Sequence, residues 1–69
     1  MRKRLIVFLI RSKYGLKKWE RFRFANQLSN AKYFFGNGVL WKEFESGMIK
    51  QSGVSLNYLL SDECEITIV

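Results

Sequence analysis

The stretch KKWERFRF, residues 17–24, alternates cationic and aromatic side chains. Its last four residues alternate strictly, and successive side chains of a β-strand point to opposite faces of the sheet. Phe22 and Phe24 therefore share one face, while Arg21 and Arg23 share the other. We expect the two phenyl rings to lie in a core. The two arginines are then expected to form an exposed pair with no aromatic ring beside them.

Strand patterns continue on the C-terminal side of this stretch. Residues 31–35 are rich in aromatic strand formers and run into Gly36-Asn37-Gly38. Glycine and asparagine tolerate positive φ, so this tripeptide predicts a β-hairpin that returns through residues 39–45. Residues 48–50 form a further short strand candidate. Residues 64–69 end the chain as an apolar strand that we expect to pair with the sheet.

Two segments favour helices. The apolar run at residues 5–10 fits either a buried strand or the middle of a short helix, and periodicity does not separate these alternatives. Cations on both sides frame one element over residues 2–14, which makes us favour a helix, and Gly15 then fits a C-terminal cap or a turn. Leucines spaced i, i+3 and i+4 predict a second helix over 56–61, with Ser55 as its N-cap.

These patterns predict one small α+β domain over residues 1–69. We expect an antiparallel sheet of three to four strands, packed with one or two short helices. A chain of 69 residues buries only a small core. With a single cysteine, it has no internal disulfide to support that core.

Charge is distributed unevenly along the chain. Residues 1–32 carry ten cations and one carboxylate, whereas residues 33–69 carry two cations and five carboxylates, which gives a net charge of +6. A basic half attracts phosphates or an acidic protein surface. The alternative is an ordinary solvated surface that keeps a small protein in solution.

Residue types argue against catalysis, and we expect no enzyme, no cofactor and no metal site. The chain has no histidine, the commonest general base. Cys64 lies between Glu63 and Glu65, which disfavour a thiolate, so we expect a core thiol. Glu43 and the following Glu45 are expected to be two exposed strand carboxylates.

The location is expected to be cytoplasmic. A lone cysteine without a disulfide framework suits a reducing compartment. The N-terminal apolar run spans six residues, from Leu5 to Ile10. A signal peptide needs an apolar stretch of roughly 7–15 residues, and a membrane span needs about 20. We therefore expect no membrane partner.

Aromatic residues exceed what a core of this size holds. They make up 16% of the chain, so we expect rings to be exposed on one face of the hairpin. Exposed tryptophan and tyrosine near arginine are typical of the residues that dominate protein interfaces. The candidate macromolecule-binding residues are Arg11, Lys13, Lys17, Lys18, Trp19, Arg21, Arg23 and Trp41.

A family resemblance adds context to these residues. The segments that carry it are Tyr14–Lys18, Phe22–Phe24, Lys32–Phe35, Gly38–Trp41, Ser52–Leu60 and Cys64–Ile66. Their order resembles small uncharacterised proteins of Gram-positive phages and prophages, with a GLK…F.F start, an aromatic hairpin and a closing LN.LL…EI. The resemblance covers about residues 14–67 and implies no activity or site residue. It implies an accessory protein of a mobile element that binds bacterial host machinery.

Together these observations predict a non-enzymatic phage accessory protein. Its expected partner is a host protein or ribonucleoprotein, and inhibition of a defence nuclease, as by an anti-CRISPR protein, is one version. The alternative is direct binding of nucleic acid by the basic N-terminal half. A third possibility is a homo-oligomer that assembles through a sheet edge. The cations of the nucleic-acid alternative are Arg2, Lys3, Arg4, Arg11, Lys13, Lys17, Lys18, Arg21 and Arg23.

Overall fold

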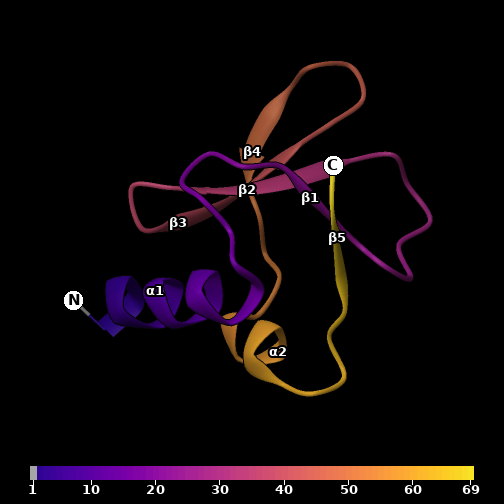
Figure 1. The fold of residues 1–69 in the computed structure, drawn as a ribbon. Helices are drawn as coiled ribbons and strands as arrows, with labels where there is room; N and C mark the ends of the chain where they lie inside the picture. The colour runs from indigo at the N-terminus through magenta and orange to yellow at the C-terminus, as the bar shows by residue number, and fades with distance from the viewer. Residues whose placement is uncertain (1) are drawn as a thin grey trace.

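The structure is a computed structural model that describes residues 2–69, with side chains described from Leu5 onward. Residues 2–69 form two helices and five strands (Figure 1). In chain order they are α1 (Arg2–Tyr14), β1 (Phe22–Phe24), β2 (Lys32–Gly36), β3 (Val39–Glu43), β4 (Ile49–Gln51), α2 (Leu56–Leu60) and β5 (Ile66–Ile68).

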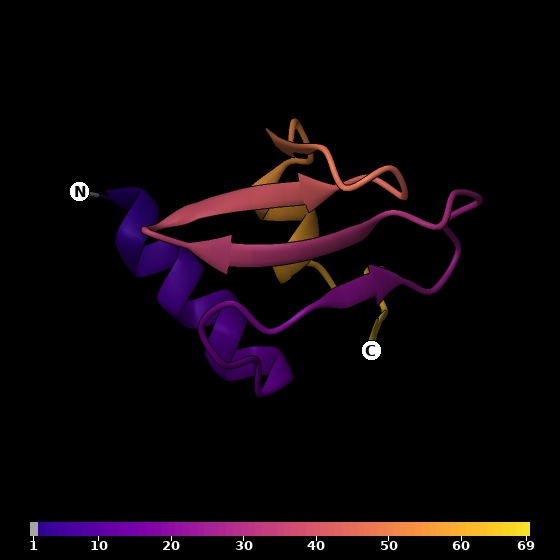
Figure 2. The ribbon, with the colours of Figure 1, turned by 90° about the horizontal axis from the view of Figure 1, so that it is seen from above.

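The strands form one antiparallel sheet in the order β4-β3-β2-β1-β5. The first four strands follow one another across the sheet, and α2 then returns the chain to the far side, where β5 pairs with β1. Both helices lie against one face of the sheet, and the view from above shows the opposite face uncovered (Figures 1 and 2). The predicted α+β fold is confirmed. The sheet has five strands rather than three to four, because both short edge segments pair.

The ambiguous N-terminal segment is the helix α1, as we favoured. Its residues Val7 and Ile10 are buried three positions apart against the sheet. Gly15 ends the helix with φ of 68°, a left-handed conformation that glycine adopts without steric penalty. The next amide, that of Leu16, donates to the carbonyl of Arg11 at 2.9 Å.

Aromatic rings from β1 and β2 form the centre of the core. Phe22 and Phe24 are buried, as predicted, and their neighbours are Tyr33 and Phe35 on the same face of β2. The rings of Phe22 and Phe35 stack with centroids 5.9 Å apart, and Phe24 meets Tyr33 edge-on at 4.8 Å. The face of β1 opposite these rings is therefore the uncovered face of the sheet.

The β2–β3 connection is the predicted hairpin. Gly36 pairs with Val39, which leaves a two-residue turn of Asn37 and Gly38. Their φ angles are 56° and 75°, and a type I′ turn requires positive φ at both positions. This turn fixes the register of β2 against β3.

The end of α1 holds α2 and the start of β5 in place. The hydroxyl of Tyr14 donates to the carbonyl of Leu59 at 2.8 Å and lies 3.2 Å from the carbonyl of Cys64. Lys13 Nζ reaches the carbonyls of Leu59 and Ser61 at 3.3 and 2.8 Å, which satisfies the C-terminal end of α2. Cys64 is a buried free thiol, as predicted.

Replacing Tyr14 by Phe is predicted to lower the free energy of unfolding by about 0.5–1.5 kcal/mol, the usual net value of such a hydrogen bond. Partial burial raises the pKa of Tyr14 above its ordinary value, and the Cys64 side chain raises it further. The folded state therefore favours the protonated hydroxyl. The contribution of the Tyr14 hydroxyl to stability is complete below about pH 10. This contribution is lost as the pH rises toward the pKa of Tyr14 in the folded protein.

Denaturant unfolding of the wild type and Tyr14→Phe from pH 7 to 11 measures this effect. The stability difference is expected to be constant up to about pH 10 and to shrink above it. A difference that grows with pH in that range would contradict the assignment.

Candidate binding surface

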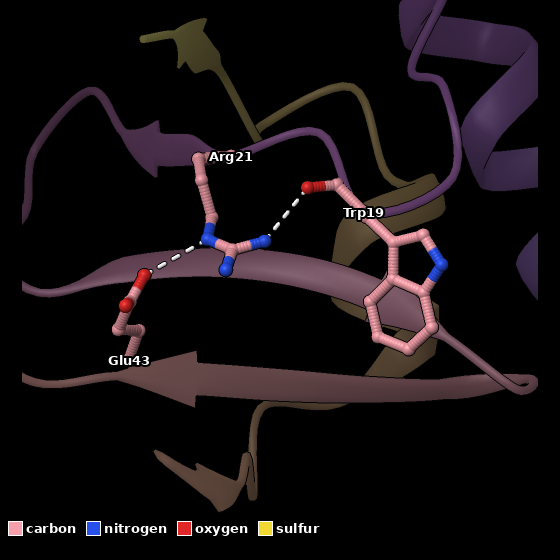
Figure 3. Close-up of polar contacts among 3 residues, drawn as sticks. All are labelled: Trp19, Arg21 and Glu43. Carbon is pink, nitrogen blue, oxygen red and sulfur yellow. Dashed lines mark hydrogen bonds and ion pairs between the residues drawn. The ribbon is translucent and has the colours of Figure 1, made fainter. Parts of the chain in front are cut away.

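Four side chains gather on the uncovered face of the sheet: Trp19, Arg21, Phe34 and Glu43. We call them the Arg21 cluster. Arg21 Nε donates to Glu43 Oε1 at 2.8 Å, and Arg21 Nη1 donates to the carbonyl of Trp19 at 2.7 Å (Figure 3). Its guanidinium carbon lies 3.8 Å from the centroid of the Phe34 ring. The guanidinium is therefore held by a carboxylate, a carbonyl and an aromatic face at once.

The strand order explains this arrangement. Arg21 directly precedes β1, Phe34 lies in the neighbouring strand β2, and Glu43 lies in β3 beyond it. The side chain of Arg21 crosses β2 to reach Glu43, as Figure 3 shows. Both partners keep about a third of their side-chain surface exposed, at 33% and 30%. The cluster thus forms part of the accessible surface.

Two predictions about charged residues are wrong here. Arg21 was expected to lack a neighbouring ring, but β2 supplies Phe34 on the same face. Alternation within one strand gives no information about side chains on the next strand. Glu43 was expected to be an exposed carboxylate, but it is half-buried in the ion pair with Arg21. Glu45 is exposed and accepts a hydrogen bond from Asn30 Nδ2 at 3.3 Å.

Trp19 covers Phe34 and occupies the space above Gly36. Its backbone has φ of 68°, and its amide donates to the carbonyl of Phe35 at 3.0 Å. The indole centroid lies 5.6 Å from that of Phe34, and a Cβ on Gly36 would overlap the indole ring. Phe34 is only 3% exposed, so it is not one of the rings that we expected this face of the hairpin to expose. On this face of the sheet the exposed ring is instead that of Trp19, at 46%.

Trp41 borders the Arg21 cluster. It pairs with Phe34 across β2 and β3, and it is half-buried. Its indole Nε1 donates to the carbonyl of Gly36 at 3.0 Å. On β4, Ile49 pairs with Glu43 and is 48% exposed, which extends the same face with an apolar side chain.

The structure does not unite the candidate cations in one surface. Arg11 and Lys13 belong to α1, in the helical layer, while Arg21 and Arg23 lie on the uncovered face. Several already bind carbonyls of the chain: Arg11 Nε contacts Leu16 at 3.3 Å, and Arg23 Nη2 contacts Ser29 at 2.8 Å. Four of the six candidate cations are thus engaged within the protein, namely Arg11, Lys13, Arg21 and Arg23.

The two remaining candidate cations lie beside Trp19. Lys17 and Lys18 are exposed, and Lys18 Nζ is 5.6 Å from the centroid of the Trp19 ring. The backbone amide of Lys17 donates a hydrogen bond to Glu20 Oε1 at 2.9 Å, which closes the short loop before β1. The structure therefore brings together Lys18, Trp19 and Arg21, with Trp41 bordering them.

Sequence reasoning missed Phe34, Gly36 and Glu43 as members of this surface. The hairpin turn provides the sequence signal from which these residues can be identified. A two-residue turn pairs Gly36 with Val39, and counting back in register pairs Phe34 with Trp41 and Lys32 with Glu43. Because Phe34 alternates with two core residues, this counting places its partners on the face opposite the core.

Among residues 2–69, no cluster of three or more metal-ligating side chains is present, and no helix has the length and apolarity to cross a bilayer. Comparison of the chain with protein-family models, curated proteins and solved structures found no match.

Gly36→Ala is predicted to displace the Trp19 ring, because the added Cβ would overlap it. Tryptophan fluorescence should shift to longer wavelength as the indole moves into water. Gly53→Ala is the matched control, since a Cβ there meets nothing within 4 Å. Equal spectra for Gly36→Ala and the wild type would contradict this packing.

A double-mutant cycle of Arg21→Met and Glu43→Gln measures the ion pair. We expect a coupling free energy of about 0.5–1 kcal/mol in urea unfolding, because both partners remain partly solvated. The same cycle with Glu45→Gln is the control and should give coupling near zero. Indistinguishable coupling in the two cycles would show that the ion pair adds nothing to stability.

Proposed function

We propose that the chain is a non-enzymatic binding protein whose uncovered sheet face contacts a partner protein. The observation that supports this proposal is the fixed position of Arg21 beside the exposed ring of Trp19. Tryptophan and arginine are enriched among the residues that dominate interface energetics. Because the Arg21 side chain is already ordered by three contacts, less conformational entropy is lost when a partner binds.

The state of the cations favours a protein over a nucleic acid as the partner. Arg21 is largely neutralised by Glu43, and Arg23 binds the carbonyl of Ser29. Affinity for a phosphate backbone depends on several cations that are free to neutralise phosphates. The apolar continuation of the face through Trp41 and Ile49 is typical of the centre of a protein interface.

The narrower form of this proposal is a phage accessory protein that binds a host protein or ribonucleoprotein. A defence nuclease is one such partner, and its inhibition would follow if the bound chain blocked its working surface. Support for this form comes from the resemblance to small phage and prophage proteins.

Direct nucleic-acid binding is the second candidate, and one observation favours it. Lys17, Lys18 and Trp19 are consecutive and exposed on one loop. An indole ring stacks on an unpaired base while adjacent lysines contact the backbone phosphates. This arrangement suits a short single strand better than a duplex.

Affinity capture with paired variants tests the first candidate. The wild type, Trp19→Ala and Leu28→Ala are immobilised, and proteins retained from a Gram-positive lysate at physiological salt are quantified by mass spectrometry. We expect a protein whose recovery falls about tenfold or more with Trp19→Ala, as for an interface anchor. Leu28 is fully exposed in the loop between β1 and β2, and its loss should change nothing.

A nucleic-acid titration separates the two candidates. Fluorescence of Trp19 and Trp41 is followed with single-stranded and duplex oligonucleotides at low and at physiological salt. We expect no binding at physiological salt, because Arg11, Lys13, Arg21 and Arg23 already bind groups of the chain. Micromolar binding that persists there, with no protein retained in the capture experiment, would replace the first candidate by the second.

A further inference from the structure

An open groove lies where α1 meets the β2–β3 turn. Figures 1 and 2 show this turn beside the N-terminal half of α1. The groove has a volume of about 290 Å³ and is lined by Val7, Phe8, Arg11, Lys18 and residues 35–38 of the β2–β3 hairpin. We call it the α1 groove. It opens beside α1 and adjoins the Arg21 cluster, because the Trp19 ring lies near both Lys18 and Gly36.

Two cations and no carboxylate line the α1 groove. Arg11 uses Nε for the carbonyl of Leu16, which fixes the side chain. Its two terminal nitrogens make no hydrogen bond to the residues described from 5 to 69. Lys18 is exposed, and its Nζ lies over the Trp19 ring. It forms no ion pair with the residues described from 5 to 69. Both groups are therefore available to an anionic ligand.

An exposed apolar stripe begins at the groove. Leu5, Phe8 and Leu9 are 58%, 64% and 46% exposed and are spaced i, i+3 and i+4, so they share one side of α1. The opposite side of α1 packs into the core through Val7 and Ile10. Three large apolar side chains exposed together on a short helix indicate an interaction site rather than a contribution to the core.

We propose that the α1 groove and this stripe bind an acidic amphipathic segment of a partner protein. Carboxylates of the segment pair with Arg11 and Lys18, while its apolar side chains cover Phe8 and the two leucines. The sign of the charge determines the occupant. Residues 1–18 carry seven cations and no carboxylate, so an acidic segment is attracted.

Other occupants fit less well. A second copy of the chain in a symmetric dimer would bring two such cationic segments together, and like charges repel. A bilayer surface is broad and does not enter a hollow between a helix and a hairpin turn. A nucleic acid would neutralise the cations but leave Leu5 and Leu9 without apolar contacts.

The proposal is tested by peptide display. Peptides that bind the full chain are selected from a library of random 12-residue sequences. We expect enriched peptides that intersperse aspartate or glutamate with aliphatic or aromatic residues. Binding of the best peptide, measured by isothermal titration calorimetry, should weaken about tenfold or more in Phe8→Ala and in Lys18→Glu. Both positions are exposed, so the variants should fold, and circular dichroism checks this.

Matched control variants distinguish binding at this site from nonspecific hydrophobic or electrostatic binding. Leu28→Ala removes an exposed apolar side chain elsewhere, and Lys50→Glu reverses an exposed charge on β4. Neither should change peptide affinity by more than about twofold. Equal losses in the controls, or enriched peptides without carboxylates, would overturn the proposal.

Three further outcomes would also overturn it. One is the absence of any enriched peptide. Another is peptide binding that Trp19→Ala abolishes and Phe8→Ala leaves intact, which would assign the peptides to the uncovered face. The third is Phe8-dependent binding to phosphatidylglycerol vesicles without peptide binding, which would identify a lipid surface as the occupant.

Discussion

Close approach of the Trp19 ring to Gly36 determines the geometry of the uncovered sheet face. Without a side chain at Gly36, the indole lies flat on β2 and covers Phe34. The same position of Trp19 directs its carbonyl to Arg21, whose guanidinium then lies on Phe34 and reaches Glu43. One glycine in β2 thus permits a contact network that joins the loop before β1 to β2 and β3.

Several cations of this basic chain stabilise the fold, which changes how its charge is interpreted. Lys13 and Tyr14 bind carbonyls at the end of α2, a helix of five residues that is too short to be stable alone. Arg11 and Arg23 bind carbonyls at the ends of neighbouring loops. Satisfying backbone carbonyls with long cationic side chains suits a domain that has no disulfide. Net charge alone therefore overstates the number of groups available to phosphate.

Local patterns predicted the fold well and the candidate surface only in part. The period-two alternation placed Phe22 and Phe24 in the core, and the glycine–asparagine turn predicted the β2–β3 hairpin. The position of the Arg21 side chain depends on residues of β2 and β3. The alternation within a single strand therefore does not predict it. Trp19 adopts positive φ, which tryptophan rarely does, and no local sequence signal marks this conformation. Two tertiary contacts accompany it, the ring against Gly36 and the amide donating to the carbonyl of Phe35.

The two proposed surfaces constrain how partners approach the molecule. The Arg21 cluster lies on the uncovered face of the sheet, whereas the α1 groove opens beside α1, in a chain with a radius of gyration of 11.2 Å. A single flat surface does not cover both. If both sites are occupied together, either one partner wraps around the β2–β3 turn or two partners are bridged. When one partner contacts both sites, binding at the first site raises the effective concentration of that partner at the second. Two weak sites then give a high overall affinity. In a small domain whose core leaves Phe8 and Trp19 exposed, such joint binding also supplies the burial that the isolated chain lacks.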